Sequence, residues 1–241
     1  MKIIQSKLLN QFASVTQGFT TKDSGNLAFH VNDNRSKVIQ NHQNLALLLE
    51  YDVNLLVHMK QIHKTDIKII TECDNFYTPP TCDALITDKK NTPLMVMVAD
   101  CSPILFYDSK KEVIAVAHAG RAGAFGNIIA STLKSFRENF NSKAEDIFVS
   151  VGASIQSCCY EVGEEIVQEA KGLNLEYAII KRDNSYFLDI SAILKRQLQN
   201  ENILQNNIEF SDECSYCCDD KYFSYRTQKH TGRFAGVISL K

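Results

Sequence analysis

The chain has 241 residues, of which 44% are hydrophobic and 22% are charged, and its formal net charge is −2. This composition is typical of a globular protein with one large domain or two small ones. A charge so close to neutrality gives no electrostatic reason to expect nucleic acid or a membrane surface as a partner. The first residues lack the apolar stretch of an export signal, and the longest apolar runs, such as residues 94–99, are too short to span a bilayer. We therefore expect a cytoplasmic protein, monomeric or homodimeric.

The predicted elements mix helices and strands along the whole chain. Periodicity of 3.6 predicts helices, and short aliphatic or β-branched runs between turn residues predict buried strands. The expected helices begin near residue 36, with Leu45 and Leu47–Leu49 as an apolar face, and then cover residues 126–139, 164–170 and 190–198. The expected strands cover residues 54–59, 66–71, 84–87, 94–99, 104–107, 113–117 and 147–151, and strand character returns over residues 223–240.

The order of these elements indicates the fold class. Strands and helices do not alternate strictly, which favours an α+β fold with mixed β-sheets over a doubly wound fold. No stretch rich in Pro, Gly or Ser interrupts the chain, and no period of 20–50 residues repeats. We therefore expect a single domain over residues 1–241.

Three segments place a metal-ligating side chain beside an expected strand. Cys101 follows the run that ends at residue 99, His118 follows residues 113–117, and His63 lies between two expected strands. Each has a simpler interpretation, because a cysteine is often a small core residue and a lone histidine is often structural. A thiolate with two imidazoles, however, is a good zinc site that leaves the fourth coordination position open, as catalytic zinc sites do. The three residues together predict such a site.

The eight cysteines also include Cys214 and Cys217 in a C-x-x-C pattern and the vicinal pair Cys158-Cys159. A vicinal pair lacks the spacing of a zinc knuckle, and the C-x-x-C lies in an acidic, turn-rich stretch instead of at a helix start. With no export signal, reduced thiols are expected. The pattern favours a role in packing and loop structure over structural zinc or redox chemistry.

Arginine is the natural planar partner of phosphate or carboxylate, which makes Arg226 a candidate anion contact, although Arg226 and Arg233 could equally be solvated surface charges. The sequence contains no P-loop, no G-x-G-x-x-G, no H-E-x-x-H and no nucleoside deaminase signature of the H-x-E with P-C-x-x-C type.

The motifs together resemble those of the YfiH-like family, also called the polyphenol oxidase or laccase-domain family, which includes purine nucleoside phosphorylases. The matching segments run from residue 18 to residue 240. They include TCDALIT at residues 81–87, ADCSPILF at 99–106, AHAG at 117–120, GASI at 152–155, CYEVG at 159–163, CSYC at 214–217, FSYR at 223–226 and TGR at 231–233.

The resemblance implies a single domain of α/β/β/α layers with His63, Cys101 and His118 as metal ligands and catalytic residues. It implies zinc, with copper as another possible metal, and phosphorolysis of adenosine, inosine and S-methyl-5′-thioadenosine. Deamination of adenosine is implied as a further reaction. The partners would be purine nucleosides and phosphate.

The chain departs from the family pattern at two places. Where the family usually has Trp-Arg after His-Ala-Gly, this chain has Arg121-Ala122, so that Arg121 would have to bind phosphate from a shifted position. An arginine common in the N-terminal turn of the family is Lys22 here. These changes affect the expected substrate preference more than the expected metal site.

Three alternatives remain open from the sequence. One is a copper-dependent polyphenol oxidase, although six scattered histidines are few for a laccase. Another is a cysteine hydrolase with Cys101 as nucleophile and His118 as base. The last is a metal-stabilised binding module without enzymatic activity.

Overall fold

The computed structural model describes residues 2–241, and their strands form three sheets. The large sheet has the order β12-β8-β6-β7-β4-β3. Its strands are Ile208–Phe210 (β12), Ile147–Val151 (β8), Ser102–Asp108 (β6), Val113–Ala119 (β7), Ala84–Thr87 (β4) and Ile67–Ile69 (β3). The second sheet has the order β1-β2-β13-β5. Its strands are Ile3–Ile4 (β1), Val15–Thr20 (β2), Phe234–Leu240 (β13) and Leu94–Val98 (β5).

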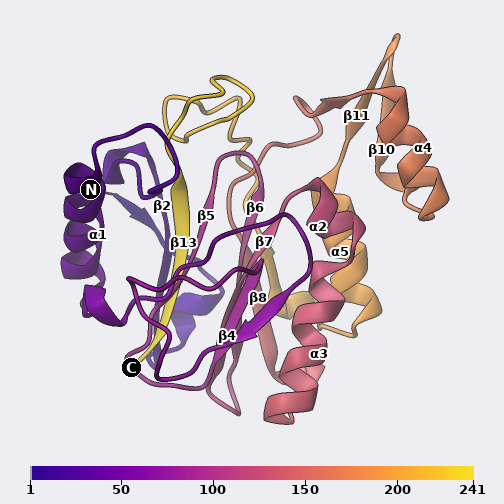
Figure 1. Cartoon of the computed structure of the whole chain (residues 1–241). Coiled ribbons are helices and arrows are strands. Elements are labelled where there is room, and N and C mark those ends of the chain that lie inside the picture. Colours follow the sequence, from indigo (N-terminus) through magenta and orange to yellow (C-terminus); the bar gives the residue numbers. More distant parts are fainter. Residues whose placement is uncertain (1) are drawn as a thin grey trace.

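The two sheets pack face to face between outer helices (Figure 1). The α-helices are Arg35–Leu49 (α1), Arg121–Phe125 (α2), Ile128–Phe140 (α3), Glu164–Gly172 (α4) and Ile190–Asn200 (α5). Helix α1 covers the four-stranded sheet, and α2, α3 and α5 cover the six-stranded sheet. Short 3-10 helices lie at Leu9–Gln11, Lys22–Ser24, Val53–Leu55, Ala144–Asp146, Glu176–Ala178 and Gln205–Asn207.

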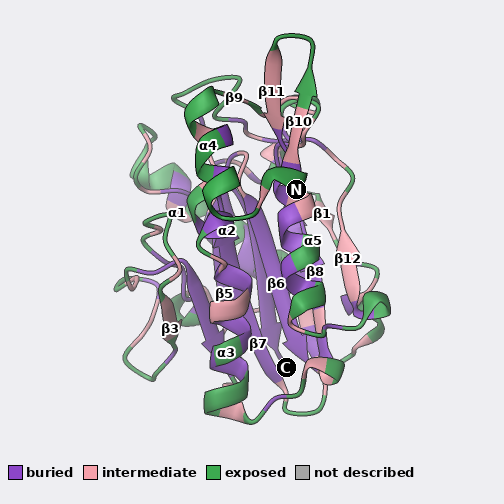
Figure 2. Ribbon diagram, turned by 90° about the vertical axis from the view of Figure 1, so that its right-hand side faces the viewer, coloured by how far each residue is buried: buried purple, intermediate pink, exposed green. Residues whose placement is uncertain are grey.

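Alternation along the central strands explains the layers. In β6, Ile104 and Phe106 face the helices, whereas Leu105 and Tyr107 face the other sheet. All four side chains are buried, as are the neighbouring residues of β7 (Figure 2). A strand buried on both faces reads as a continuous apolar run, which is why the sequence indicated these strands well.

A small third sheet projects from one end of the molecule. It consists of Glu161–Val162 (β9), Ser185–Leu188 (β11) and Ile179–Arg182 (β10), in the order β10-β11-β9. The tip of its hairpin is exposed and stands clear of the main body, next to α4 (Figures 1 and 2).

The expected α+β fold with α/β/β/α layers is confirmed, but several element predictions were wrong. Residues 54–59 form a 3-10 turn and an isolated bridge between Val57 and Leu94 instead of a strand. On α1, Leu45 and Leu49 are buried, but Leu47 is 79% exposed and Leu48 is 48% exposed, because only one side of the helix meets the sheet. The C-terminal strand character is confined to β13. Within residues 2–241, no helix has the length and apolar character needed to cross a membrane.

Candidate active site

Cys101 lies where the chain crosses from one sheet to the other, between β5 and β6. The preceding Asp100 has a left-handed backbone, with φ of 85°. Its carboxylate accepts hydrogen bonds from the Ser215 hydroxyl and from the backbone N–H of Arg226, both at 2.7 Å. Its carbonyl oxygen accepts a bond from the N–H of Ile155 at 2.9 Å. These bonds to three separate segments fix the crossing and therefore the position of Cys101.

His118 is held beside Cys101 by the pairing of β6 with β7. In that register Pro103 is the partner of His118 and Ser102 is the partner of Ala119. His118 is buried, and its Nδ1 lies 2.9 Å from a carboxylate oxygen of the buried Asp83. Because Asp83 occupies Nδ1, the Nε2 atom of His118 is the one left for a ligand.

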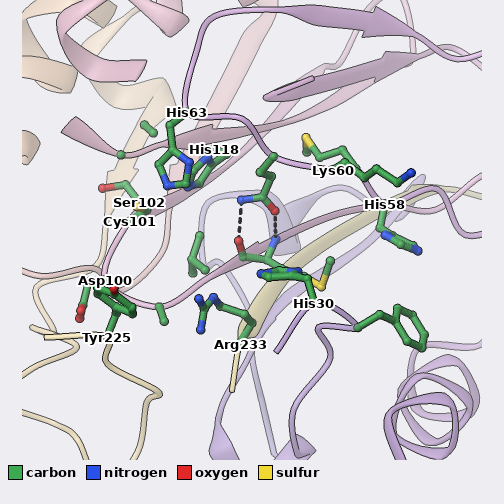
Figure 3. Close-up of a pocket in the computed structure, with 18 of the residues that line it drawn as sticks. His30, His58, Lys60, His63, Asp100, Cys101, Ser102, His118, Tyr225 and Arg233 are labelled. Atoms are coloured by element: carbon green, nitrogen blue, oxygen red, sulfur yellow. Dashed lines mark hydrogen bonds between the residues drawn. The ribbon is translucent and has the colours of Figure 1, made fainter. Parts of the chain in front are cut away.

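The same carboxylate shapes the loop that presents His63. The backbone N–H groups of Ile62, His63 and Lys64 all point at the Asp83 carboxylate, at distances of 2.8–3.3 Å. His63 itself has a left-handed backbone, with φ of 58°, which turns its ring toward His118 (Figure 3). Asp83 thus positions both histidines. Sequence reasoning missed this role, although Asp83 lies in the TCDALIT motif.

The donor atoms of His63, Cys101 and His118 all lie within 4.8 Å of one another. The two imidazole rings are nearly perpendicular, at 86°, with centroids 4.7 Å apart. Gly120 leaves the room for this arrangement, because a Cβ there would lie 2.8 Å from the Cys101 sulfur and 3.3 Å from the His63 ring. A thiolate and two imidazoles fit zinc, and a carboxylate on the second ring nitrogen is the usual support of a zinc-ligating histidine.

The charges of the site reinforce one another. Burial alone would raise the pKa of the Cys101 thiol, but the nearby His118 and His63 rings lower it to about 6. Burial would lower the pKa of His118, but Cys101 and Asp83 raise it to about 9. Burial likewise opposes ionisation of Asp83, yet the bonds from His118 and the loop N–H groups hold its pKa below the usual range. Cys101 is therefore a thiolate near neutral pH, the form that binds metal or attacks as a nucleophile.

These three residues lie in the wall of a cavity of about 1050 Å³. Its lining is partly aromatic, with Phe29, Phe76, Tyr77, Tyr160 and Tyr225. Its cations include Arg35, Lys60, Arg121, Arg226 and Arg233. A cavity of this kind, mostly apolar with a few convergent polar groups, is typical of a small-molecule site.

The arginines of the cavity are not equivalent. The guanidinium of Arg121 pairs with Glu169. Arg226 donates to the carbonyl oxygen of Glu161 at 3.1 and 3.2 Å and lies over the ring of Tyr160. Arg233 donates from one nitrogen only, to the carbonyl oxygens of Thr231 and Gly232, and reaches into the cavity (Figure 3). Arg121, Arg226 and Arg233 all line the cavity. The sequence offered Arg121 and Arg226 as phosphate contacts, which remains a prediction, and did not single out Arg233.

The structure also brings Cys158, Cys159, Cys214 and Cys217 together, with all four sulfur atoms within 4.8 Å of one another. In the sequence these two pairs are candidates for a zinc site, but a vicinal pair lacks the spacing of a zinc knuckle, which favours a role in packing and loop structure. The fold nevertheless brings the pairs together, although they are more than fifty residues apart. Cys218, which adjoins Cys217, is not part of it.

Comparison with known proteins agrees with the motifs. The family described as "Multi-copper polyphenol oxidoreductase laccase" matches residues 11–241. The chain belongs to this YfiH-like family. It is 34% identical over 227 residues to a purine nucleoside phosphorylase of Clostridium acetobutylicum, covering 92% of this chain and 91% of that protein. It is 30% identical over 220 residues to the purine nucleoside phosphorylase YfiH of Escherichia coli, covering 90% and 87%.

Solved structures of YfiH-like proteins have the same fold. The hypothetical protein YfiH of Bacillus licheniformis superposes with a TM-score of 0.90 at 31% identity, over 97% of this chain and 94% of that chain. YlmD of Geobacillus stearothermophilus superposes with a TM-score of 0.86 at 28% identity, over 95% of this chain and 93% of that chain. The likeness extends over almost the whole length of each chain.

Proposed function

We propose that this YfiH-like chain is a zinc-dependent purine nucleoside phosphorylase that acts on adenosine, inosine and S-methyl-5′-thioadenosine and also deaminates adenosine. The observation that carries the proposal is the convergence of His63, Cys101 and His118 within 4.8 Å of one another in the wall of a large cavity. The names of relatives that match over nine-tenths of the chain give the substrate class.

The cavity suits a nucleoside together with phosphate. Its volume of about 1050 Å³ slightly exceeds the usual range of small-molecule sites, which leaves room for two substrates. The rings of Tyr160 and Tyr225, or of Phe29 and Phe76 at the other end, offer flat apolar surfaces on which a purine can stack.

In phosphorolysis, a phosphate oxygen attacks C1′ of the ribose while the bond from C1′ to the purine nitrogen breaks and the base leaves with a proton. The phosphate needs a cation, and Arg233 is the best placed, because its guanidinium is only partly engaged by the protein. The charge of Arg121 is already paired with the Glu169 carboxylate, and both terminal nitrogens of Arg226 donate to the Glu161 carbonyl oxygen, whereas Arg233 has no carboxylate partner. Zinc on His63, Cys101 and His118 would supply a Lewis acid that lowers the pKa of coordinated water toward neutrality, as deamination requires.

The test is product chromatography after the purified, metal-quantified chain is incubated with adenosine, with and without phosphate and with and without a chelator. We expect adenine only with phosphate, inosine without phosphate, and hypoxanthine from that inosine when phosphate is present. All of these products should be lost in His63→Ala, which controls for contaminating enzymes. The absence of all these products from protein that carries zinc at this site would contradict the proposal.

The same experiment separates the alternatives. A cysteine hydrolase built on the Cys101 thiolate and His118 would keep its activity in the chelator.

A laccase would need a trinuclear copper cluster. Among residues 2–241, the groups close enough to share an ion are the triad and the four-cysteine cluster, and neither has more than two histidines. We therefore propose zinc rather than copper.

A further inference from the structure

The four cysteines gathered at one end of the molecule are the second cluster of metal-ligating side chains in residues 2–241. Cys158 and Cys159 lie in the turn between β8 and β9, and Cys214 and Cys217 lie in the loop after β12. A bridge between Ser154 and Cys214 and a hydrogen bond from the N–H of Ser215 to the carbonyl of Ser154 join the two segments. We propose that Cys158, Cys159, Cys214 and Cys217 bind one zinc ion in tetrahedral thiolate coordination, separate from the active site.

The spacing of the sulfur atoms fits a single ion. A zinc–sulfur distance of about 2.3 Å in a tetrahedron places the sulfurs about 3.8 Å apart. The Cys158 and Cys217 sulfurs are 3.7 Å apart, the Cys159 and Cys217 sulfurs are 3.2 Å apart, and no pair exceeds 4.8 Å. A disulfide needs about 2.05 Å, and all four thiols are free. One distance is close to the tetrahedral value and the other is shorter, so the Cys159 and Cys217 sulfurs would have to move apart by about 0.6 Å to seat the ion.

Two polar contacts lie beside the cluster. The backbone N–H of Gln156 donates to the sulfur of the buried Cys214 at 3.4 Å, the kind of bond that orients and stabilises a ligating thiolate. The guanidinium of Arg182 donates to the carbonyl oxygen of Cys158 at 3.4 Å, which brings a positive charge close to the cluster. Cys158 and Cys217 are exposed, so an ion can enter from solvent.

Four protein ligands leave no open position, which makes this a structural site. The ion would clamp together two segments that both contact the crossing at Asp100. Ser215, between the two C-x-x-C cysteines, donates to the Asp100 carboxylate, and Ile155 donates to its carbonyl. Tyr160, next to Cys159, lines the cavity. The clamp would thus hold one wall of the cavity in place without touching the substrate.

Metal analysis of the full chain tests the proposal. We expect two zinc ions per chain in the unaltered protein, one in Cys214→Ser/Cys217→Ser and one in His63→Ala. Cys218→Ser is the matched control, because it alters the same loop outside the cluster, and it should retain two. Cobalt loaded into His63→Ala should give the visible bands of a tetrahedral tetrathiolate ion, which the active-site triad could not give.

The two sites fail independently in this experiment. If His63→Ala keeps the full zinc content while the double cysteine variant loses one ion, the active-site proposal is wrong and this one stands. Iron in place of zinc, a disulfide among these cysteines in the metal-loaded protein, or an unchanged zinc content in Cys214→Ser/Cys217→Ser would each overturn the cysteine site.

A second measurement needs no variant and covers the case in which the double variant does not fold. Alkylation mapped by peptide mass spectrometry should be slow at the four cysteines of the zinc-loaded protein and fast after removal of the metal, whereas the exposed Cys73 should react in both. Equal rates at Cys158, Cys217 and Cys73 in the loaded protein would contradict the proposal.

Discussion

At the scale of single residues, Asp83 connects the parts of the candidate active site. Its carboxylate accepts hydrogen bonds from the His118 ring and from the backbone N–H groups of three consecutive loop residues. A neutral amide at this position would still reach the same groups but would offer only one oxygen and no negative charge. The arrangement of His63 and His118 therefore depends on a residue that is not itself a member of the triad and does not line the cavity.

We expect Asp83→Asn to weaken zinc binding at the triad by about 10- to 100-fold, because the loss of such a supporting carboxylate misaligns a ligating histidine and lowers its basicity. The dissociation constant can be measured by competition with a chelator. Asp88→Asn, at the other end of β4 and exposed, is the control and should bind zinc as the unaltered chain does. Equal zinc affinities in the two variants would show that Asp83 does not support zinc binding at the triad.

Arg233 allows a second test at this scale, which rests on the proposed phosphorolysis. Arg233→Ala should raise the KM for phosphate at least tenfold and leave the deamination of adenosine, which uses no phosphate, nearly unchanged. Arg137→Ala is the control, since that guanidinium pairs with Glu201 on the outer surface of the helical layer. A parallel loss of both reactions in Arg233→Ala would indicate a general structural role instead.

At the scale of elements, the sequence predicted the central strands but not the polar ones. Strands β6 and β7 lie at the centre of the six-stranded sheet, and β5 is the edge strand that pairs with β13 in the other sheet; each contains a run of at least four consecutive apolar residues. Strand β2 contains Gln17 and Thr20, which are buried through hydrogen bonds that no local pattern reveals. The expected strand at residues 54–59 does not form. Part of this apolar run is buried in the core, but the run pairs with a neighbouring strand only through the bridge between Val57 and Leu94.

The candidate site shows the same limit. The triad could be proposed because Cys101 and His118 each adjoin a strand that the sequence indicates and that forms, whereas one of the two strands expected beside His63 does not form. The Asp83 network and the four-cysteine cluster depend on contacts between distant segments, which spacing along the chain does not encode. The residues next to Arg233 in the sequence do not distinguish it from an arginine exposed on the surface.

Helix α1 packs against its sheet partly through a buried histidine. The ring of His42 stacks on Phe29 with an interplanar angle of 5°, and its Nε2 lies 2.8 Å from the carbonyl oxygen of Leu27. Burial, together with the nearby His58, lowers the pKa of His42 to about 4 despite that bond. In the unfolded chain the pKa of a histidine is about 6.5. Between about pH 6.5 and pH 4, His42 is therefore protonated in the unfolded state but stays neutral in the folded state.

The free energy of unfolding should therefore fall as the pH falls from 6.5 to 4, with His42 contributing on the order of 3 kcal/mol over that range. Urea unfolding at a series of pH values measures this slope. In His42→Gln the slope should be smaller, although the variant is less stable at pH 7. His230→Gln, which alters an exposed histidine, should keep the slope of the unaltered chain. If both variants keep it, the acid sensitivity arises elsewhere.

At the scale of the whole molecule, one set of strands serves several cores. Strands β6 and β7 supply side chains to the core beneath α3 and to the core between the sheets, and β5 and β13 supply side chains to the latter and to the core beneath α1. No layer can lose its packing without exposing a face of the next. This continuity is the physical reason to expect that residues 1–241 behave as a single domain.

That expectation predicts a single calorimetric transition, with equal calorimetric and van't Hoff enthalpies. Leu105→Ala, between the sheets, and Leu45→Ala, beneath α1, alter fully buried side chains in different layers, and each should cost about 2–5 kcal/mol. Both should move the whole transition to lower temperature. Leu47→Ala, on the exposed side of the same helix, should change the stability by less than about 0.5 kcal/mol. If Leu45→Ala instead split off a separate early transition, the α1 layer would unfold by itself and the chain would contain two cooperative units.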